Sequence, residues 1–159
     1  MKTQISRNSR QVLKNYSSVC HQQGRMLTDS DLTEQALISR DRLTQALRDV
    51  IGTGTPRFGA LLQLAEDKSP ELHWGAVYVD GVPAQVKPNP EAPDNNIFDY
   101  NLQLDYPQPP ALPDSAYRLY VDIWERTIAW LDDDMLRDPG LHGADTTTRT
   151  QTVAQVKYC

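Results

Sequence analysis

The chain has 159 residues, of which 39% are hydrophobic and 23% charged, and its formal net charge is -5. The length fits one ordinary domain, since independent domains usually comprise about 100–200 residues. The acidic balance argues against a nucleic-acid-binding surface, which needs Lys and Arg concentrated on one face, and against adsorption to an anionic membrane. No run approaches the ~18–20 apolar residues of a membrane span, and the N-terminus has no signal-peptide core. We therefore expect cytoplasmic synthesis and no direct membrane insertion.

Residues 1–27 are predicted to form a basic extended arm. Residues 1–25 contain no acid, and their cations are Lys2, Arg7, Arg10, Lys14 and Arg25. Two interpretations stay open: the arm lies on an acidic neighbour, or it is a solvated tail.

The stretch "QGRMLTDSDLTEQ" precedes the longest helical pattern, residues 28–52. Read as a calcium loop with Asp29 at position 1, it has Glu34 where Gly is needed and Arg40 where Glu is needed. Read as a helix start, Thr28 accepts a free amide and the acids fill the first turn, where the helix dipole favours negative charge. We predict an amphipathic helix that begins here and stops at Gly52.

The apolar residues of this helix fall on one stripe and are Leu32, Ala36, Leu43, Leu47 and Val50. The same spacing would suit a short coiled-coil seam against copies of the chain, although Ser39 occupies a seam position and the heptads are few.

Residues 58–159 are predicted to form a mainly antiparallel β domain, which makes the fold class α+β. A three-strand meander is expected at 60–65, 72–79 and after Asp80-Gly81, a sequence typical of a type I′ hairpin turn. In the middle strand one face is predicted to carry Leu72, Trp74, Ala76 and Tyr78. Pro83 places the returning strand at an edge.

The segment 88–113 holds seven of the eleven prolines and is expected to run extended. Within it, "FDYNLQLDY" alternates strictly, and its apolar residues are Phe98, Tyr100, Leu102, Leu104 and Tyr106. Such a strand either lies on its own sheet or is donated to a neighbouring subunit.

The run "YRLYVDIWERTIAWL" changes the face of its apolar residues midway, which predicts a bulge near Glu125 or a strand that leaves one layer for another. A final strand follows over 148–158. Because the chain ends inside this strand pattern, either the strand pairs to its end or the protein continues beyond Cys159.

No enzymatic, cofactor or metal constellation stands out. Asp132-Asp133-Asp134 could bind a cation but is better interpreted as solvated or as a short helix start. His142 with Asp145 could resemble a base and its orienting carboxylate, although a Gly-rich corner is more often structural. The two thiols, Cys20 and Cys159, support neither a disulfide framework nor a metal site.

The segments "YSSVCHQQGRMLTDSDLTEQ", "WGAVYVDGVPAQV", "YRLYVDIWERTI" and "DPGLHGADTTTRTQTVAQVK" resemble an uncharacterised N-terminal domain from phage-tail-like and contractile-injection-system gene clusters. The resemblance spans about Ile5 to Tyr158. It is most specific at Gln22 to Arg25 with Asp31 and Glu34, and in the terminal run "DTTTRTQTVAQVK". Leu32 stands where many relatives carry Trp, a conservative change on the core face. The resemblance implies a structural component of a baseplate or tail fibre, with no catalytic residues to carry over.

Three functions follow as hypotheses. The first is a non-enzymatic homo-oligomer, most simply a trimer, that joins other tail or baseplate subunits in a particle assembled in the cytoplasm, with release to the outside of the cell as an open alternative. Its predicted subunit-interface residues are Arg25, Leu32, Leu43, Leu47, Phe98, Tyr100, Leu102, Leu104 and Tyr106. The second is a carbohydrate- or receptor-binding module that uses Trp74, Trp124 or Trp130. The third is a hydrolase with Asp122 and Glu125, or the Asp132 cluster, as paired carboxylates.

Overall fold

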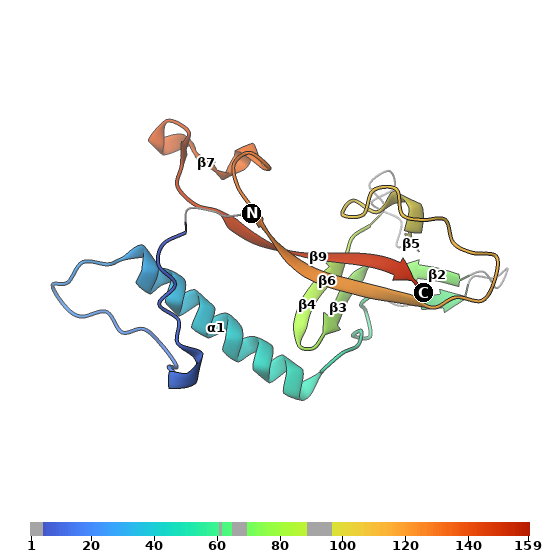
Figure 1. The fold of residues 1–159 in the computed structure, drawn as a ribbon, viewed down its shortest axis with the longest axis horizontal. Helices are drawn as coiled ribbons and strands as arrows, with labels where there is room; N and C mark the ends of the chain where they lie inside the picture. Colours follow the sequence, from blue (N-terminus) through green and yellow to red (C-terminus); the bar gives the residue numbers. More distant parts are fainter. Residues whose placement is uncertain (1–4, 61, 65–69, 89–96) are drawn as a thin grey trace. The chain divides into compact units, whose positions relative to one another are not determined.

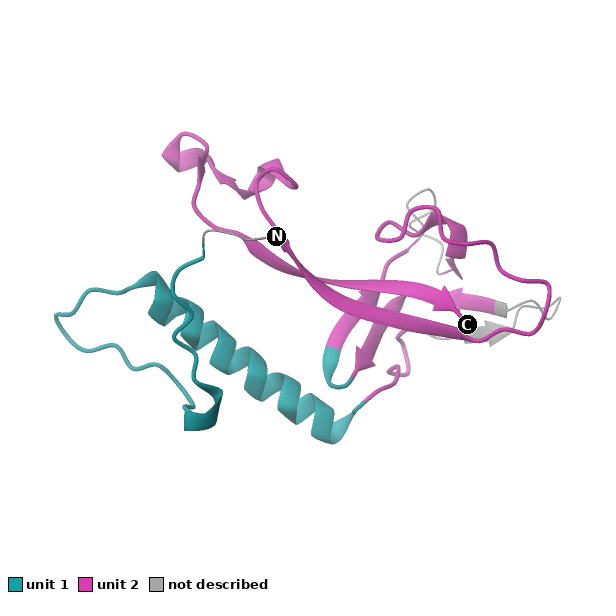
Figure 2. Ribbon diagram, viewed as in Figure 1, with its two compact units in different colours: residues 1–52, 80–82 teal, residues 53–79, 83–159 magenta. Residues whose placement is uncertain are grey.

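The computed structural model describes residues 5–60, 62–64, 70–88 and 97–159, with the side chains of 62–64 and 70 left out. Figure 1 shows one α-helix and several antiparallel strand pairs, so the predicted α+β class is confirmed. The chain divides into two units, coloured in Figure 2. Unit 1 is Met1–Gly52 with Asp80–Val82, and unit 2 is Thr53–Val79 with Pro83–Cys159.

Unit 1 consists of the N-terminal arm, helix α1 (Asp29–Val50) and the turn Asp80–Val82. The arm contains a short 3-10 turn, η1 (Val12–Lys14). Thr28 caps α1 by accepting a hydrogen bond from the Asp31 amide at 3.3 Å. The helix ends where Gly52 adopts a left-handed φ of 68° and donates its amide to Leu47. Both ends of the predicted helix are therefore confirmed.

The prediction that the apolar stripe of α1 faces the core is wrong, because the opposite side of the helix is the buried one. Ile38 is fully buried, whereas Leu32, Leu43 and Val50 are 55%, 58% and 83% exposed. Leu32 is therefore not on a core face. The reason is that the arm lies on the polar side of the helix, where Ile38 is the single buried apolar residue.

In the described part of unit 2, the strands form four small antiparallel groupings. Strands β1 (Leu62–Leu64), β2 (Pro70–His73) and β5 (Ile97–Phe98) form a sheet in the order β1-β2-β5. Strands β3 (Gly75–Val79) and β4 (Val82–Val86) form a hairpin, with Val82 itself grouped in unit 1.

A long two-stranded ribbon pairs β6 (Leu119–Ile128) with β9 (Arg149–Tyr158). The chain between these strands contains η3 (Asp134–Leu136), β7 (Arg137–Asp138), η4 (Pro139–Leu141) and β8 (Ala144–Asp145), and β7 pairs with β8. Among the described residues of unit 2, one buried core cluster comprises Ala60, Val77, Ala84, Val86 and Val156, and Val153 on β9 is also buried.

The predicted middle strand of the meander is broken between β2 and β3. Gly75 has a φ of 149°, and a Cβ there would lie 2.7 Å from the Gly59 carbonyl carbon, so the chain needs glycine at this close approach. The break changes which side chains face the core: Leu72 packs against it in β2, and Val77 is buried in β3. The single predicted face is therefore wrong. The hairpin turn is confirmed, with φ of 50° at Asp80 and 77° at Gly81.

The predicted bulge near Glu125 is absent from the ribbon. Residues pair one to one from Leu119 with Tyr158 to Ile128 with Arg149. Leu119, Val121 and Ile123 pack against the core, and beyond them this face carries the exposed, polar Glu125. Where the parity changes, Trp124 pairs with Val153, which is only 1% exposed, so the ribbon buries apolar surface on its other face there. The change of face requires no extra residue.

The alternation in "FDYNLQLDY" does not produce a long strand. Only Ile97–Phe98 is strand, after which Asp99 accepts a hydrogen bond from the Asn101 amide at 2.8 Å and starts η2 (Tyr100–Leu102). Phe98 and Tyr100 pack against the core of unit 2. The local aspartate cap thus overrides the alternating pattern.

Candidate interaction surfaces

The arm is attached to α1 by polar contacts, which we call the arm clamp. Ser6 and Ser9 donate hydrogen bonds to the carboxylates of Asp29 and Glu34. Arg10 Nε donates to Asp41 Oδ2 at 3.1 Å, and the Val19 amide donates to Gln35 Oε1 at 2.7 Å. These four contacts cover the polar side of the helix.

Electrostatics favour this arrangement in two ways. The Ser6 hydrogen bond, followed by the Ser30 amide, lowers the pKa of Asp29 from its ordinary value of 3.8. The Arg10 side chain is only 10% exposed beside Asp41. The predicted basic arm therefore finds its acidic partner on the chain's own helix.

The opposite side of α1 is an apolar stripe without cover. It holds Leu32, Ala36, Leu43 and Val50, all of which are exposed, and the partly exposed Leu47. Contiguous exposed apolar surface of this kind marks an interaction site more often than isolated exposed residues do. The three predicted interface residues of the helix, Leu32, Leu43 and Leu47, lie in this stripe.

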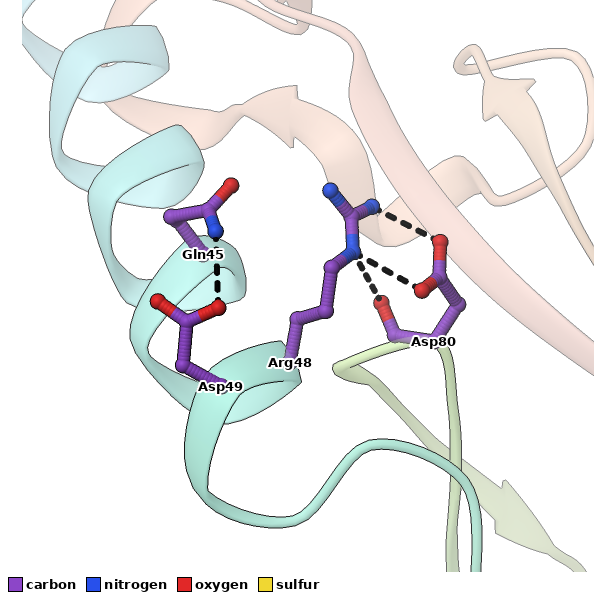
Figure 3. Close-up of polar contacts among 4 residues, drawn as sticks. All are labelled: Gln45, Arg48, Asp49 and Asp80. Carbon is purple, nitrogen blue, oxygen red and sulfur yellow. Dashed lines mark hydrogen bonds and ion pairs between the residues drawn. The ribbon is translucent and has the colours of Figure 1, made fainter.

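The turn Asp80–Val82 is fixed against the last turns of α1, as Figure 3 shows. Arg48 Nε and Nη2 donate to the two carboxylate oxygens of Asp80, each at 2.8 Å, and Nε also reaches the Asp80 carbonyl at 3.3 Å. A Cβ on Gly81 would lie 2.5 Å from the Arg48 amide nitrogen and the Thr44 carbonyl oxygen. Glycine is therefore required both for the turn and for the contact with the helix.

The Pro-rich segment is attached to β9 by Gln103. Its Oε1 accepts from the Val156 amide at 2.8 Å, and its Nε2 donates to the Val156 carbonyl at 3.0 Å. The side-chain amide thus makes the pair of bonds that a neighbouring strand would make. Gln103 is buried, and the sequence pattern gave no sign of it because the residue falls on the polar side of the alternation.

Asp105 provides a second attachment. Its carboxylate lies 2.5 Å from Lys87 Nζ and 3.6 Å from Arg126 Nη2, and its side chain is largely buried. Its carbonyl accepts from Gln155 at 2.6 Å. Together with Gln103, it holds this segment on its own unit.

One face of the β6–β9 ribbon carries two half-exposed aromatic rings beside the buried Val153. Tyr120 and Trp124 are 44% and 42% exposed and lie on the same face of β6, with Asp122 between them. Asp122 accepts from Lys157 Nζ on β9 at 2.6 Å, and this hydrogen bond raises the pKa of Lys157 from 10.5. The face therefore combines ring surfaces with a paired charge.

The chain between β6 and β9 exposes a second set of apolar side chains: Leu131, Met135 and Leu141. Two of its aspartates accept hydrogen bonds from backbone amides. Asp132 accepts from the Ala129 amide and Asp133 from the Met135 amide, at 2.9 and 3.0 Å. The interpretation of this cluster as a short helix start is confirmed by η3, which Asp133 caps.

The other predicted site residues lie apart from one another. Asp122 and Glu125 point to opposite faces of β6, because three residues separate them in an unbroken strand. His142 is the C-cap of η4, with a left-handed backbone conformation. Asp145 lies in β8, opposite Arg137 of β7 in the strand register. Among the described residues, no three His, Cys, Asp or Glu side chains come together as metal ligands would.

The remaining predicted interface residues differ in exposure. Arg25 and Leu104 are exposed, whereas Leu102 and Tyr106 are partly buried. Trp130 lies under the Arg137 guanidinium, 4.0 Å from its ring centre, and Trp74 is partly exposed. Within the described ranges, no helix combines the length and apolarity that a membrane crossing requires.

A family model, described as a family of unknown function (DUF6519), matches residues 1–159. The chain belongs to this family. No curated protein and no solved structure matches it.

Proposed function

We propose that the protein is a non-enzymatic structural subunit of a contractile injection system or phage-like tail, acting at the baseplate or tail fibre through contacts with other subunits. The observation that carries the proposal is the bare apolar stripe of α1. A helix in a closed domain turns its apolar side inward, whereas this helix has its polar side covered and its apolar side open. That arrangement suits a subunit whose helix is completed by a neighbour.

Two further features support assembly. The exposed apolar residues between β6 and β9, Leu131, Met135 and Leu141, offer a second contact surface, in unit 2. The resemblance of the sequence segments to tail-associated domains names the kind of particle. The proposal does not include donation of the Pro-rich segment to a neighbouring subunit, because Gln103 and Asp105 attach this segment to its own unit.

The test is to separate tail-like particles from the source cells by gradient sedimentation and to identify their proteins by mass spectrometry. We expect this chain in the particle fraction, and antibody labelling in electron microscopy should locate it at one end. A chain found only in the soluble fraction, while particles of the same cells lack it, would overturn the proposal.

A carbohydrate- or receptor-binding module is the second candidate, and the rings of Tyr120 and Trp124 favour it. Planar aromatic rings on a strand face can stack on sugars, and the Asp122–Lys157 pair could bond hydroxyl groups. Titration of the chain with oligosaccharides, followed by tryptophan fluorescence, tests this candidate. Binding that is lost in Trp124→Ala but kept in Trp130→Ala supports the module, and an unchanged signal across the oligosaccharides excludes it.

A further inference from the structure

We propose that the apolar stripe of α1 pairs with the same stripe of a second copy, with the two helices parallel and in register. The inference rests on the proposed function, in which a neighbouring subunit covers this stripe, and it adds that the neighbour is a second copy of the chain in parallel orientation.

The spacing of the stripe is that of a coiled coil. The exposed residues Leu32, Ala36, Ser39, Leu43, Ala46 and Val50 follow one another at intervals of four, three, four, three and four residues. This alternation places Ala36, Leu43 and Val50 at a positions and Leu32, Ser39 and Ala46 at d positions. The seam, as we call these six residues, runs almost the full length of the 22-residue helix.

The helix has one side available for such a partner. The arm clamp holds the opposite side through Glu34 and Asp41, and Ile38 is buried beneath the arm. Its contacts at Asp29 and Gln35 fall at an a and a g position, at the N-terminal end of the seam. A second helix can therefore approach the seam C-terminal to Gln35 without displacing the arm.

The charges beside the seam select the parallel orientation. In a full-length antiparallel pair, Arg42 would face Arg42 of the second copy, and Arg40 would likewise face its counterpart, because equivalent flanking positions meet across an antiparallel seam. In a parallel pair, Arg42 lies beside Leu47 of the second copy and Gln35 beside Arg40. The parallel pair thus brings no like charges together along the seam.

The small residues of the seam limit the apolar area that the two helices can bury against each other. Ala36, Ser39 and Ala46 allow the helix backbones to approach closely, while Ser39 places a hydroxyl in the middle of the seam. The helix is about 33 Å long, so the contact is at the small end of specific interfaces. We therefore expect reversible association, with a dissociation constant on the order of micromolar.

The orientation is tested by disulfide cross-linking of the full chain. Both native cysteines, Cys20 and Cys159, are exposed and are first replaced by Ser. Ser39→Cys places thiols opposite each other in a parallel pair, whereas in the antiparallel pair Ser39 faces Leu43. The matched control is Gln45→Cys, exposed on the other side of the same helix.

Under mild oxidation we expect Ser39→Cys to form a disulfide-linked dimer at least about tenfold faster than Gln45→Cys, since proximity raises the effective thiol concentration. Equal rates for the two variants would overturn the inference.

Association itself is measured by sedimentation velocity up to about 100 μM, a range that brackets a micromolar dissociation constant. The wild type should form a dimer, Leu43→Lys should remain monomeric, and Gln45→Lys should associate normally. A monomeric wild type, or Leu43→Lys associating like the wild type, would overturn the inference. Circular dichroism confirms that both variants are folded.

The two proposals fail separately. Cross-linking that excludes the seam leaves recovery of the chain in particles untouched, and absence from particles leaves a measured helix pair intact.

Discussion

Different interactions stabilise the interior of each of the two units. In unit 1, α1 buries a single apolar side chain, Ile38, and its arm is attached through charged and polar groups. In unit 2, five apolar residues form a buried cluster, and strands and partly buried rings pack around it. Burial of apolar area depends little on salt or pH, whereas exposed ion pairs depend on both. Salt and acid should therefore act first on unit 1.

The largest effect is expected from the core of unit 2. Val156→Ala removes two methyl groups from a side chain that is almost completely buried, and should lower the free energy of unfolding by about 2–3 kcal/mol. Urea denaturation measures this change, which should be equal in low and high salt. Thr150→Ala, on the exposed part of the same strand, is the control and should change little. A loss that shrinks in salt would contradict the assignment of this region to apolar packing.

The turn against α1 comes next. Gly81→Ala combines a left-handed φ with a Cβ that would lie 2.5 Å from backbone atoms of α1, and we expect a loss of about 2 kcal/mol. Gly54→Ala is the matched control, since a Cβ there meets nothing within 4 Å. Thermal unfolding compares the two variants. Equal melting temperatures would mean that the turn does not need to approach the helix.

A smaller effect is expected in the arm clamp. Arg10→Ala removes the ion pair with Asp41, whose side chain is 41% exposed, so solvent screening limits the loss to about 1 kcal/mol. Hydrogen exchange at Val19 and neighbouring arm amides should accelerate, and 1 M salt, in which the Debye length is about 3 Å, should reduce the difference from wild type. Arg7→Ala, at an exposed cation of the same arm, should leave exchange unchanged.

The smallest effect is the acid response of Asp29. Its pKa is lower in the folded protein than the ordinary 3.8, because the ionised carboxylate accepts from Ser6. The stabilisation is therefore present above the unfolded pKa and is lost as pH falls through the folded value. As pH falls below about 4, the protection factors of the arm amides, which correct for the slower intrinsic exchange in acid, should decrease in the wild type. In Asp29→Asn this pH response should be smaller, and a response equal to that of the wild type would assign it to the other carboxylates of the arm clamp, Glu34 and Asp41.

The local signals in the sequence were sufficient for part of the fold. Thr28 with Asp31 predicted the start of α1, and Asp80-Gly81 predicted the hairpin turn, because each depends on neighbouring residues alone. The break at Gly75 was missed because it depends on the approach of residues distant in sequence, Gly59 and Ala60. The apolar stripe was predicted correctly as a pattern, but a pattern does not say which side of a helix its own chain will cover.

The candidate surfaces were predicted less completely. The cations of the arm were visible in the sequence, yet nothing local indicated that Arg10 would meet Asp41, 31 residues away. The alternation from Phe98 to Tyr106 predicted a strand, whereas the local cap at Asp99 and the insertion of Gln103 produced a different path. Tertiary hydrogen bonds of this kind override propensity and leave no periodic trace.

Gln103 has a consequence for how the β6–β9 ribbon can grow. The unpaired edge of a strand is a template for another chain, and edges left open invite aggregation or strand addition. The Gln103 side chain already makes the two hydrogen bonds that the outward amide and carbonyl of Val156 would offer to another strand. A strand from another chain can pair with β9 at this residue only after the Gln103 side chain has moved away.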